Sequence, residues 1–350
     1  MRTEEWEAGA LRRHVGRLDQ VAGVRLVTLG DGGERGVRVL EFRTGTGFDF
    51  ELVVDRCMDV GRCVLRGRSL AWESPTGWLA PERYEPQGSG WLRSFGGGLL
   101  TTCGLDHIGA PDEGIGLHGR ASNLPARLVG YGTRADADGG LTLWAEGEVT
   151  QAAVFGERLT LRRRVEARVG SSSLRIDDAV VNEGFAPAEQ MLLYHVNAGF
   201  PLLDEGAELL VPARRVRALR DHHGTDGYTT MVGPQPGWEE QVFGHDNAAE
   251  ADGRVPVALV NRARGYGLYQ RYRRDQLPYH WTWRMLGEGT YVLGIEPSTN
   301  RVESRAQARE RGELTLLEPG EERRFELELG ALDGEAEIDA FAARVAALVG

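Results

Sequence analysis

Hydrophobic and polar residues alternate along most of the chain after residue 23. Successive side chains of a strand point to opposite faces, so this period of two predicts strands with one buried face. We expect strands at residues 24–29, 37–42, 48–53, 141–149, 158–169, 174–181, 191–197, 255–260, 267–272, 280–285, 291–295 and 324–329. The 48 glycines are spread along the chain and punctuate these segments as turns would.

Helical spacing is confined to the two ends of the chain. The first end has apolar residues at helical intervals, namely Leu11, Val15 and Leu18, and the last has one apolar face, made by Ile338, Phe341, Val345 and Leu348. No helix-period segment recurs between the strands, so a parallel sheet is not expected. We predict an all-β fold, a large antiparallel β-sandwich over residues 1–350 as one domain, with short terminal helices at 1–20 and 336–350.

The composition excludes several classes of protein. Hydrophobic residues make up 41% of the chain, and no stretch approaches the roughly 18 apolar residues that cross a membrane. The 52 acidic residues exceed the 41 basic ones and give a net charge of −11, which disfavours nucleic acid as a partner. All the basic residues are Arg, which excludes Schiff-base chemistry and a P-loop lysine.

The chain has no feature of an exported protein. Acidic residues occupy the first positions, where a signal peptide needs an apolar core. The three cysteines, Cys57, Cys63 and Cys103, form neither a disulfide framework nor a zinc motif. We therefore expect a cytoplasmic protein with reduced thiols, a monomer or a homodimer, that binds neither nucleic acid nor membrane.

Three stretches carry candidate chemistry. His118 lies among glycines downstream of Arg93 and three consecutive glycines, in a setting typical of a ligand site or of a surface loop. His195 and Asn197 share one face of the strand at 191–197, either in a pocket or in the core. Glu296 ends an apolar strand, where burial would raise the pKa of its carboxyl and suit a general base; the alternative is a solvent-facing glutamate.

Proton-transfer chemistry on a sugar needs only these residue types. Opening a cyclic hemiacetal requires a base at the anomeric hydroxyl and an acid at the ring oxygen, and one carboxylate and one imidazole suffice. We expect His195 and Glu296 to face each other across a hollow that holds one pyranose. No cofactor is expected, and no metal, because the remaining histidines lack metal-ligand spacing (His107, His118, His245 and His280). Tyr279, Trp281 and Trp283 share a face that could stack on a sugar or fill the core.

At these residues the sequence resembles the aldose 1-epimerase (galactose mutarotase-like) superfamily, and more closely an aldose 1-epimerase-like branch, over about residues 24–329. Asn182-Glu183-Gly184, Pro187 and the strand Leu193-Tyr194-His195-Val196-Asn197 resemble the strand pair that carries the catalytic histidine. The resemblance implies His195 as the general acid. Gly294-Ile295-Glu296 resembles the strand of the general base, which implies Glu296 in that role.

Further substrate contacts are implied by the same resemblance. Leu117-His118-Gly119-Arg120 resembles the His-Gly element, so His118 would complete the catalytic group by hydrogen-bonding the substrate. Arg93 resembles a substrate-binding arginine, although Ser94 and Phe95 separate it from the glycines. The resemblance also implies a sugar-binding aspartate, for which Asp106 and Asp246 are both candidates. Beside it, we take Asn197, Arg120 and Arg56 as candidates for the pocket rim.

Three functions follow as expectations. The first is a cofactor-independent aldose 1-epimerase, or mutarotase, that acts on a sugar or sugar derivative by acid–base ring opening at the anomeric carbon. The second is a noncatalytic sugar-binding protein with the same pocket. The third is an isomerase or lyase acting on an acidic or phosphorylated sugar, which an arginine-rich pocket (Arg93, Arg120 and Arg284) would favour.

Overall fold

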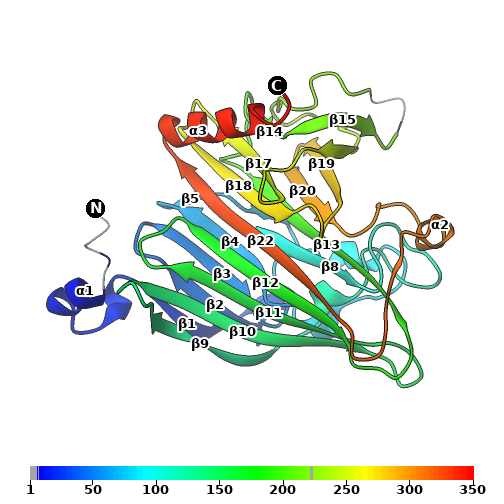
Figure 1. The fold of residues 1–350 in the computed structure, drawn as a ribbon, viewed down its shortest axis with the longest axis horizontal. Coiled ribbons are helices and arrows are strands. Elements are labelled where there is room, and N and C mark those ends of the chain that lie inside the picture. The colour runs from blue at the N-terminus through cyan, green and yellow to red at the C-terminus, as the bar shows by residue number, and fades with distance from the viewer. Residues whose placement is uncertain (1–5, 7, 221–223) are drawn as a thin grey trace.

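The computed structural model describes residue 6, residues 8–220 and residues 224–350 (Figure 1). An eight-stranded sheet forms the layer nearest the viewer, and its strands run in the order β14-β17-β18-β22-β12-β11-β10-β9. Their bounds are β9 Arg127–Ala135, β10 Leu141–Ala152, β11 Arg158–Arg168, β12 Ser173–Asn182, β14 Glu208–Leu210, β17 Arg254–Asn261, β18 Tyr266–Arg273 and β22 Glu322–Asp333.

Two further sheets lie behind this layer. One has the order β1-β2-β3-β4-β5, with β1 Gly23–Thr28, β2 Arg38–Arg43, β3 Phe48–Val53, β4 Asp59–Leu65 and β5 Arg68–Ser69. The other has the order β15-β16-β19-β20-β13-β21, with β8 also paired to β13. Its bounds are β8 Leu100–Leu105, β13 Ala188–Gly199, β15 Ala213–Ala218, β16 Gln241–Asn247, β19 Tyr279–Gly287, β20 Thr290–Ser298 and β21 Thr315–Leu317. A short pair, β6 Trp72–Glu73 and β7 Gly97–Gly98, completes the strands.

The antiparallel β-sandwich is confirmed. Every pairing between named strands of the described residues is antiparallel. Each predicted segment overlaps an observed strand, and the segments 24–29, 37–42 and 158–169 each extend one residue beyond theirs. The observed strands that were not predicted are the short strands β5, β6, β7, β14 and β21 and the longer strands β4, β8, β9, β15 and β16. Strand β15 shows why, because the sequence Ala213-Arg214-Arg215-Val216-Arg217-Ala218 has no apolar face, and long-range pairing alone makes it a strand.

The N-terminal helix is shorter than predicted. Residues 1–5 and 7 of the predicted segment lie outside the described residues, and helix α1 covers Ala8–His14 before a separate 3₁₀ turn at Leu18–Gln20. Gly16 lies between the two, and glycine costs about 1 kcal/mol relative to alanine inside a helix. Helix α2 (Arg305–Glu310) was not predicted, and α3 (Glu335–Ala346) corresponds to the predicted C-terminal helix.

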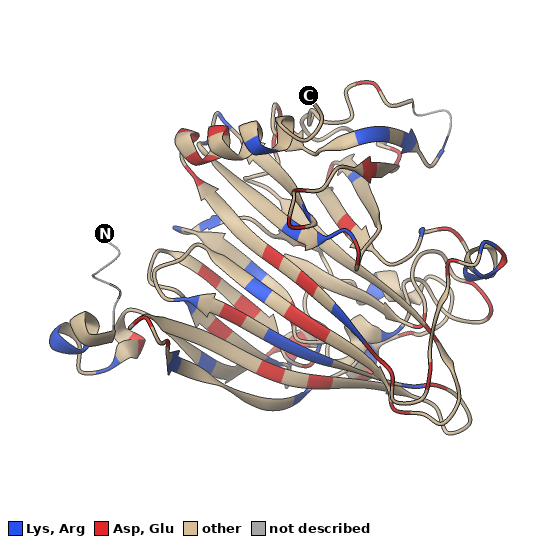
Figure 2. Ribbon diagram, viewed as in Figure 1, with Lys and Arg blue, Asp and Glu red and all other residues tan. Residues whose placement is uncertain are grey.

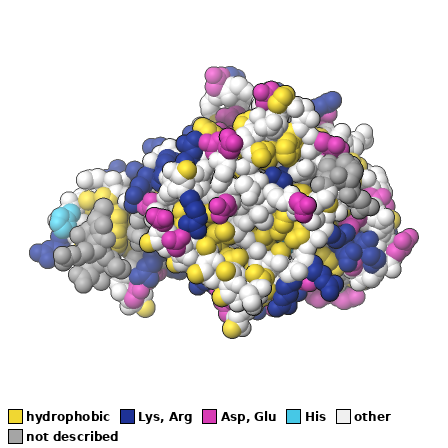
Figure 3. Space-filling model, turned by 90° about the horizontal axis from the view of Figure 1, so that it is seen from above, with side chains coloured by type: hydrophobic (Ala, Val, Ile, Leu, Met, Phe, Trp, Pro, Cys, Tyr) yellow, Lys and Arg dark blue, Asp and Glu magenta, His cyan; other side chains and the backbone are white. Residues whose placement is uncertain are grey.

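Helix α3 docks by its apolar stripe. Ile338, Phe341 and Val345 are buried in a cluster with residues of β17 and β22. No helix of the described residues is long and apolar enough to cross a membrane. On the face seen in Figure 3, acidic and basic side chains lie interspersed.

A buried polar network joins β13 to the eight-stranded sheet. Arg163 on β11 is fully buried and donates hydrogen bonds to Asp178 on β12 and Asp59 on β4. The hydroxyl of Tyr194 on β13 donates to Asp178 Oδ2 at 2.6 Å. Tyr194 therefore points into the sandwich, and by alternation His195 points to the outer face of its own sheet.

Candidate functional site

His195 and Glu296 meet on that outer face. The register that pairs Val196 with Ile295 and Leu193 with Ser298 places His195 opposite Glu296 on β20. His195 Nε2 lies 3.2 Å from Glu296 Oε1, and each residue is 4% exposed. The expected hollow between them is absent, because at this distance the two side chains touch.

Gly294 makes this contact possible. It lies two residues before Glu296 on β20, so both face the same side of the sheet. A Cβ added at Gly294 would lie 2.3 Å from Glu296 Oε1 and 3.2 Å from His195 Cε1. Any side chain at this position would push the carboxyl away from the imidazole.

Aromatic rings enclose the pair. The Phe95 ring centroid lies 5.3 Å from that of His195, and the Trp283 centroid lies 5.5 Å away. Trp91 stacks on Phe95 at 4.3 Å, and Trp72 contacts both Phe95 and Trp283. These rings come from β6, β19 and the segment of the 3₁₀ turn Gly90–Arg93, which covers the outer face of the sheet.

Burial favours the uncharged form of both groups. It raises the pKa of Glu296 to about 8, with a smaller contribution from the nearby carboxylate of Glu240. It lowers the pKa of His195 to about 4, against a smaller opposing effect of Asn197. Between these two values the pair holds one proton, which can reside on the carboxyl or on the imidazole.

The structure brings His118 to the same place. Its ring centroid lies 5.7 Å from that of His195 and 4.7 Å from that of Trp91. His118 has a left-handed backbone, with φ of 58°, and the amide of Gly109 donates to its Nδ1 at 3.3 Å. Burial lowers the pKa of His118 well below its usual value. The predicted trio of His195, Glu296 and His118 therefore converges.

Asn197 also lies beside the pair. It follows His195 on the same face of β13, and its side-chain amide donates to the carbonyls of Gly98 and His195. Its Oδ1 is buried without a hydrogen-bond partner among the described residues.

Arg93 does not lie where the resemblance implied, and Arg56 does not lie at the rim of a pocket. The side chain of Arg93 is 75% exposed and forms an ion pair with Glu85 at 2.6 Å, because its 3₁₀ turn buries Trp91 instead. Arg56 is buried, and its guanidinium donates to the carbonyls of Leu79, Ser94 and Ser122. Through these bonds Arg56 holds the covering loops together. Arg56 is therefore not a residue of the pocket rim.

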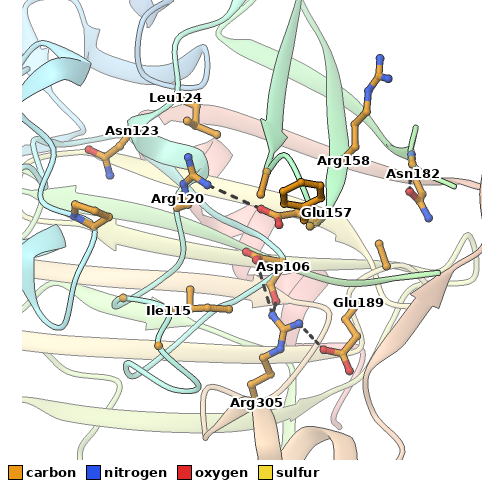
Figure 4. Close-up of a pocket in the computed structure, with 18 of the residues that line it drawn as sticks. Asp106, Ile115, Arg120, Asn123, Leu124, Glu157, Arg158, Asn182, Glu189 and Arg305 are labelled. Carbon is orange, nitrogen blue, oxygen red and sulfur yellow. Dashed lines mark hydrogen bonds and ion pairs between the residues drawn. The ribbon is translucent and has the colours of Figure 1, made fainter. Parts of the chain in front are cut away.

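Arg120 and Asp106 line a separate cleft of about 1440 Å³ (Figure 4). Arg120 Nη1 lies 3.9 Å from Glu157 Oε1, and Asp106 Oδ2 lies 3.9 Å from Arg305 Nη1. Neither His195 nor Glu296 lines this cleft. Contrary to their predicted placement at the pocket of His195 and Glu296, Arg120 and Asp106 line this separate cleft.

A smaller cavity, of about 480 Å³, is lined by residues of β15, β16 and β19. Trp281 pairs with Glu296 across β19 and β20, and it lines this cavity together with Asp246, the second candidate aspartate. Sequence analysis missed the arginines here, Arg215, Arg217 and Arg301. The available signal was the alternation Arg215-Val216-Arg217, which places two arginines on one face if the segment is a strand.

Among the described residues, no group of three or more His, Cys, Asp and Glu side chains could hold a metal ion. The candidate site consists of an imidazole and a carboxyl in contact, a second imidazole, and an aromatic enclosure.

Comparisons with known proteins give the fold and the family. The model of a family described as "Domain of unknown function (DUF4432)" matches residues 34–331. No curated protein matches the chain by sequence. A crystal structure of a candidate aldose 1-epimerase from Klebsiella pneumoniae has 26% identity, covers 93% of this chain and 88% of that chain, and has a TM-score of 0.87.

More distant structures have the same fold. A galactose mutarotase-like protein from Clostridium acetobutylicum has 11% identity and a TM-score of 0.62, over 89% of this chain and 98% of that chain. A galactose 1-epimerase from Lactobacillus acidophilus has 11% identity and a TM-score of 0.58, over 89% of this chain and 99% of that chain. The chain has a galactose mutarotase-like fold, as the resemblance implied.

Proposed function

This chain belongs to the DUF4432 family, and we propose that it is a cofactor-independent sugar epimerase that interconverts anomers by opening the ring. The observation that carries the proposal is the contact of 3.2 Å between His195 Nε2 and Glu296 Oε1 on one face of the sheet. The similarity to a structure described as a candidate aldose 1-epimerase supports it.

The pair supplies a balanced proton transfer. With the proton on His195, the Glu296 carboxylate removes the proton of the anomeric hydroxyl while the imidazolium protonates the ring oxygen. The bond between C1 and the ring oxygen breaks, and the hydroxyl oxygen becomes the aldehyde oxygen. Rotation about C1–C2 and the reverse transfer close the ring on the other face. The pair begins and ends with one proton, so the reaction needs no external acid or base.

The neighbouring groups have defined tasks in this scheme. Because its Nδ1 accepts from the Gly109 amide, the uncharged His118 carries its proton on Nε2, which can donate one hydrogen bond to a sugar hydroxyl. The rings of Phe95 and Trp283 exclude water from the pair. Because His195 and Glu296 touch, a sugar enters only when these covering rings move and the two side chains separate.

Exchange NMR on anomers of neutral, acidic and phosphorylated hexoses tests the proposal. The wild type should accelerate exchange of at least one sugar, and Glu296→Gln and His195→Asn should each lower that acceleration by at least a hundredfold. His14→Asn is the control, since His14 is exposed at the end of helix α1. Saturable sugar binding without exchange would instead identify a sugar-binding protein, and exchange unchanged in Glu296→Gln would refute the mechanism.

A further inference from the structure

The cavity beside Trp281 is rich in arginine. Arg215 and Arg217 come from β15, the edge strand of the sheet, and Arg301 follows β20; Figure 2 shows the basic residues on β15. Asp246 is the carboxylate among the lining residues, and it forms an ion pair with Arg274 at 3.0 Å. The cavity is thus locally basic in a chain whose net charge is −11.

The arginines around the cavity outnumber the carboxylates that pair with them. Glu303 is shared by Arg217 and Arg311, at 3.2 Å and 3.9 Å. Glu313 is shared by Arg301 and Arg311, at 3.3 Å and 3.0 Å. Three arginines therefore share two carboxylates.

Arg215 adds a further unpaired charge. It is exposed and has no ion-pair partner among the described residues, although it pairs in register with Asp246. A basic cavity with unmatched guanidinium groups attracts an anion, and guanidinium binds carboxylate and phosphate through two parallel hydrogen bonds.

One row of residues connects this cavity to the catalytic pair. Across the strands β13, β20, β19, β16 and β15, the registers align His195, Glu296, Trp281, Gly244 and Arg217. Adjacent strands lie about 4.8 Å apart, so Trp281 is one strand from Glu296.

Arg217 reaches back along this row. A Cβ at Gly244 would lie 2.8 Å from the Trp281 ring, so the absent side chain gives the indole room to lie over this position. The guanidinium of Arg217 lies over the indole, 5.0 Å from its centroid. The positive charge is therefore one aromatic ring away from Glu296. Trp281 Nε1 is buried without a hydrogen-bond partner among the described residues, so it is a free donor at this place.

We propose that the cavity lined by Arg215, Arg217 and Arg301 binds an anionic substituent of the sugar while the anomeric carbon lies at Glu296. The substrate class is then an aldose that carries a carboxylate or a phosphate. This inference rests on the proposed function. It uses arginines other than Arg93, Arg120 and Arg284, of which Arg284 donates to Gln241 and to the carbonyl of Thr230.

Anomer exchange on matched sugars tests the inference. Glucose, glucuronate and glucose 6-phosphate form one set, and galactose, galacturonate and galactose 6-phosphate a second. We expect kcat/KM to be at least tenfold higher for an anionic member than for its neutral counterpart, and to fall as salt concentration rises. Comparison of the acid with the phosphate identifies the anion.

Arginine variants test whether this cavity causes the preference for anionic sugars. Arg215→Gln and Arg301→Gln should each lower kcat/KM for the anionic sugar about tenfold and leave that for the neutral sugar unchanged. Arg25→Gln is the matched control, because Arg25 lies on β1 in an exposed ion pair with Glu41. Equal rates on neutral and anionic sugars, or an anion preference that survives both substitutions, would overturn the inference and leave the proposed function intact.

A lack of exchange on every sugar would refute the proposed function, and calorimetry would then decide on the cavity. Saturable binding of glucuronate or glucose 6-phosphate that is weakened in Arg215→Gln, with no binding of glucose, would support an anion-binding cavity. No binding, or binding unaffected by Arg215→Gln and Arg301→Gln, would reject it.

Discussion

Replacing the Glu296 carboxyl with an amide should change how the stability of the protein depends on pH. In the folded protein Glu296 keeps its proton up to a pKa of about 8, whereas its ordinary value is 4.5. Between these values the folded state binds more protons than the unfolded state, so the wild type loses stability as pH rises. Glu296→Gln has no such group and should not share this loss.

The magnitude follows from the linkage relation. Each pH unit over which the folded state holds one extra proton costs about 1.4 kcal/mol. For a folded pKa of about 8, the loss accumulated between pH 7 and pH 9 is about 1.4 kcal/mol. His195 contributes little to the change in stability between pH 7 and pH 9. Its lowered pKa reduces stability only when the pH falls below 6.5, the ordinary pKa of histidine.

Urea unfolding of wild type and Glu296→Gln at pH 7, 8 and 9 measures the effect. The difference in unfolding free energy should shift in favour of the variant by about 1.4 kcal/mol between pH 7 and pH 9. Glu318→Gln, in an exposed turn, is the control and should follow the wild type. A difference that stays constant with pH would show that the Glu296 carboxyl is ionised in the folded protein, and the argument for a pair that holds one proton would fail.

Three further substitutions test other parts of the site. Gly294→Ala should lower anomer exchange at least tenfold, because the added Cβ would overlap Glu296 Oε1; NMR exchange on the folded variant checks this, and an unchanged rate would contradict the contact. Arg93→Gln should leave kcat/KM unchanged within twofold, since Arg93 is exposed and paired with Glu85; a tenfold loss would place it in the site. Tyr194→Phe should cost about 1–3 kcal/mol of unfolding free energy, because the buried Asp178 loses a donor; denaturant titration measures it, and no loss would contradict the network.

Local alternation was sufficient to predict much of the fold. The strand at 191–197 alternates because Tyr194 faces the sandwich interior and His195 faces the covering loops. The type of each residue therefore indicates which face of the sheet it lies on. The same property placed His195 and Asn197 on one face. Strand β15 could not be predicted this way, because its arginines face solvent and a cavity and leave no apolar period.

Side-chain partners that depend on distant segments could not be predicted. Arg56 and Arg93 both suit an anion, yet one is saturated by three carbonyls and the other lies at the surface. The direct contact between His195 and Glu296 depends on the register of β13 and β20 and on the missing side chain of Gly294. The sequence shows the glycine but not the register, and only the register places Gly294 beside His195.

Among the described residues, strand β15 has one edge without a pairing strand, as well as its arginines. As the terminal strand of its sheet it presents backbone donors and acceptors that could pair with another chain. Its charges, from Arg214, Arg215 and Arg217, repel the same strand of a second molecule. Arg215 and Arg217, which we propose bind the anion, therefore also disfavour edge-to-edge self-association. Neutralising all three arginines would lower solubility as well as alter substrate selectivity.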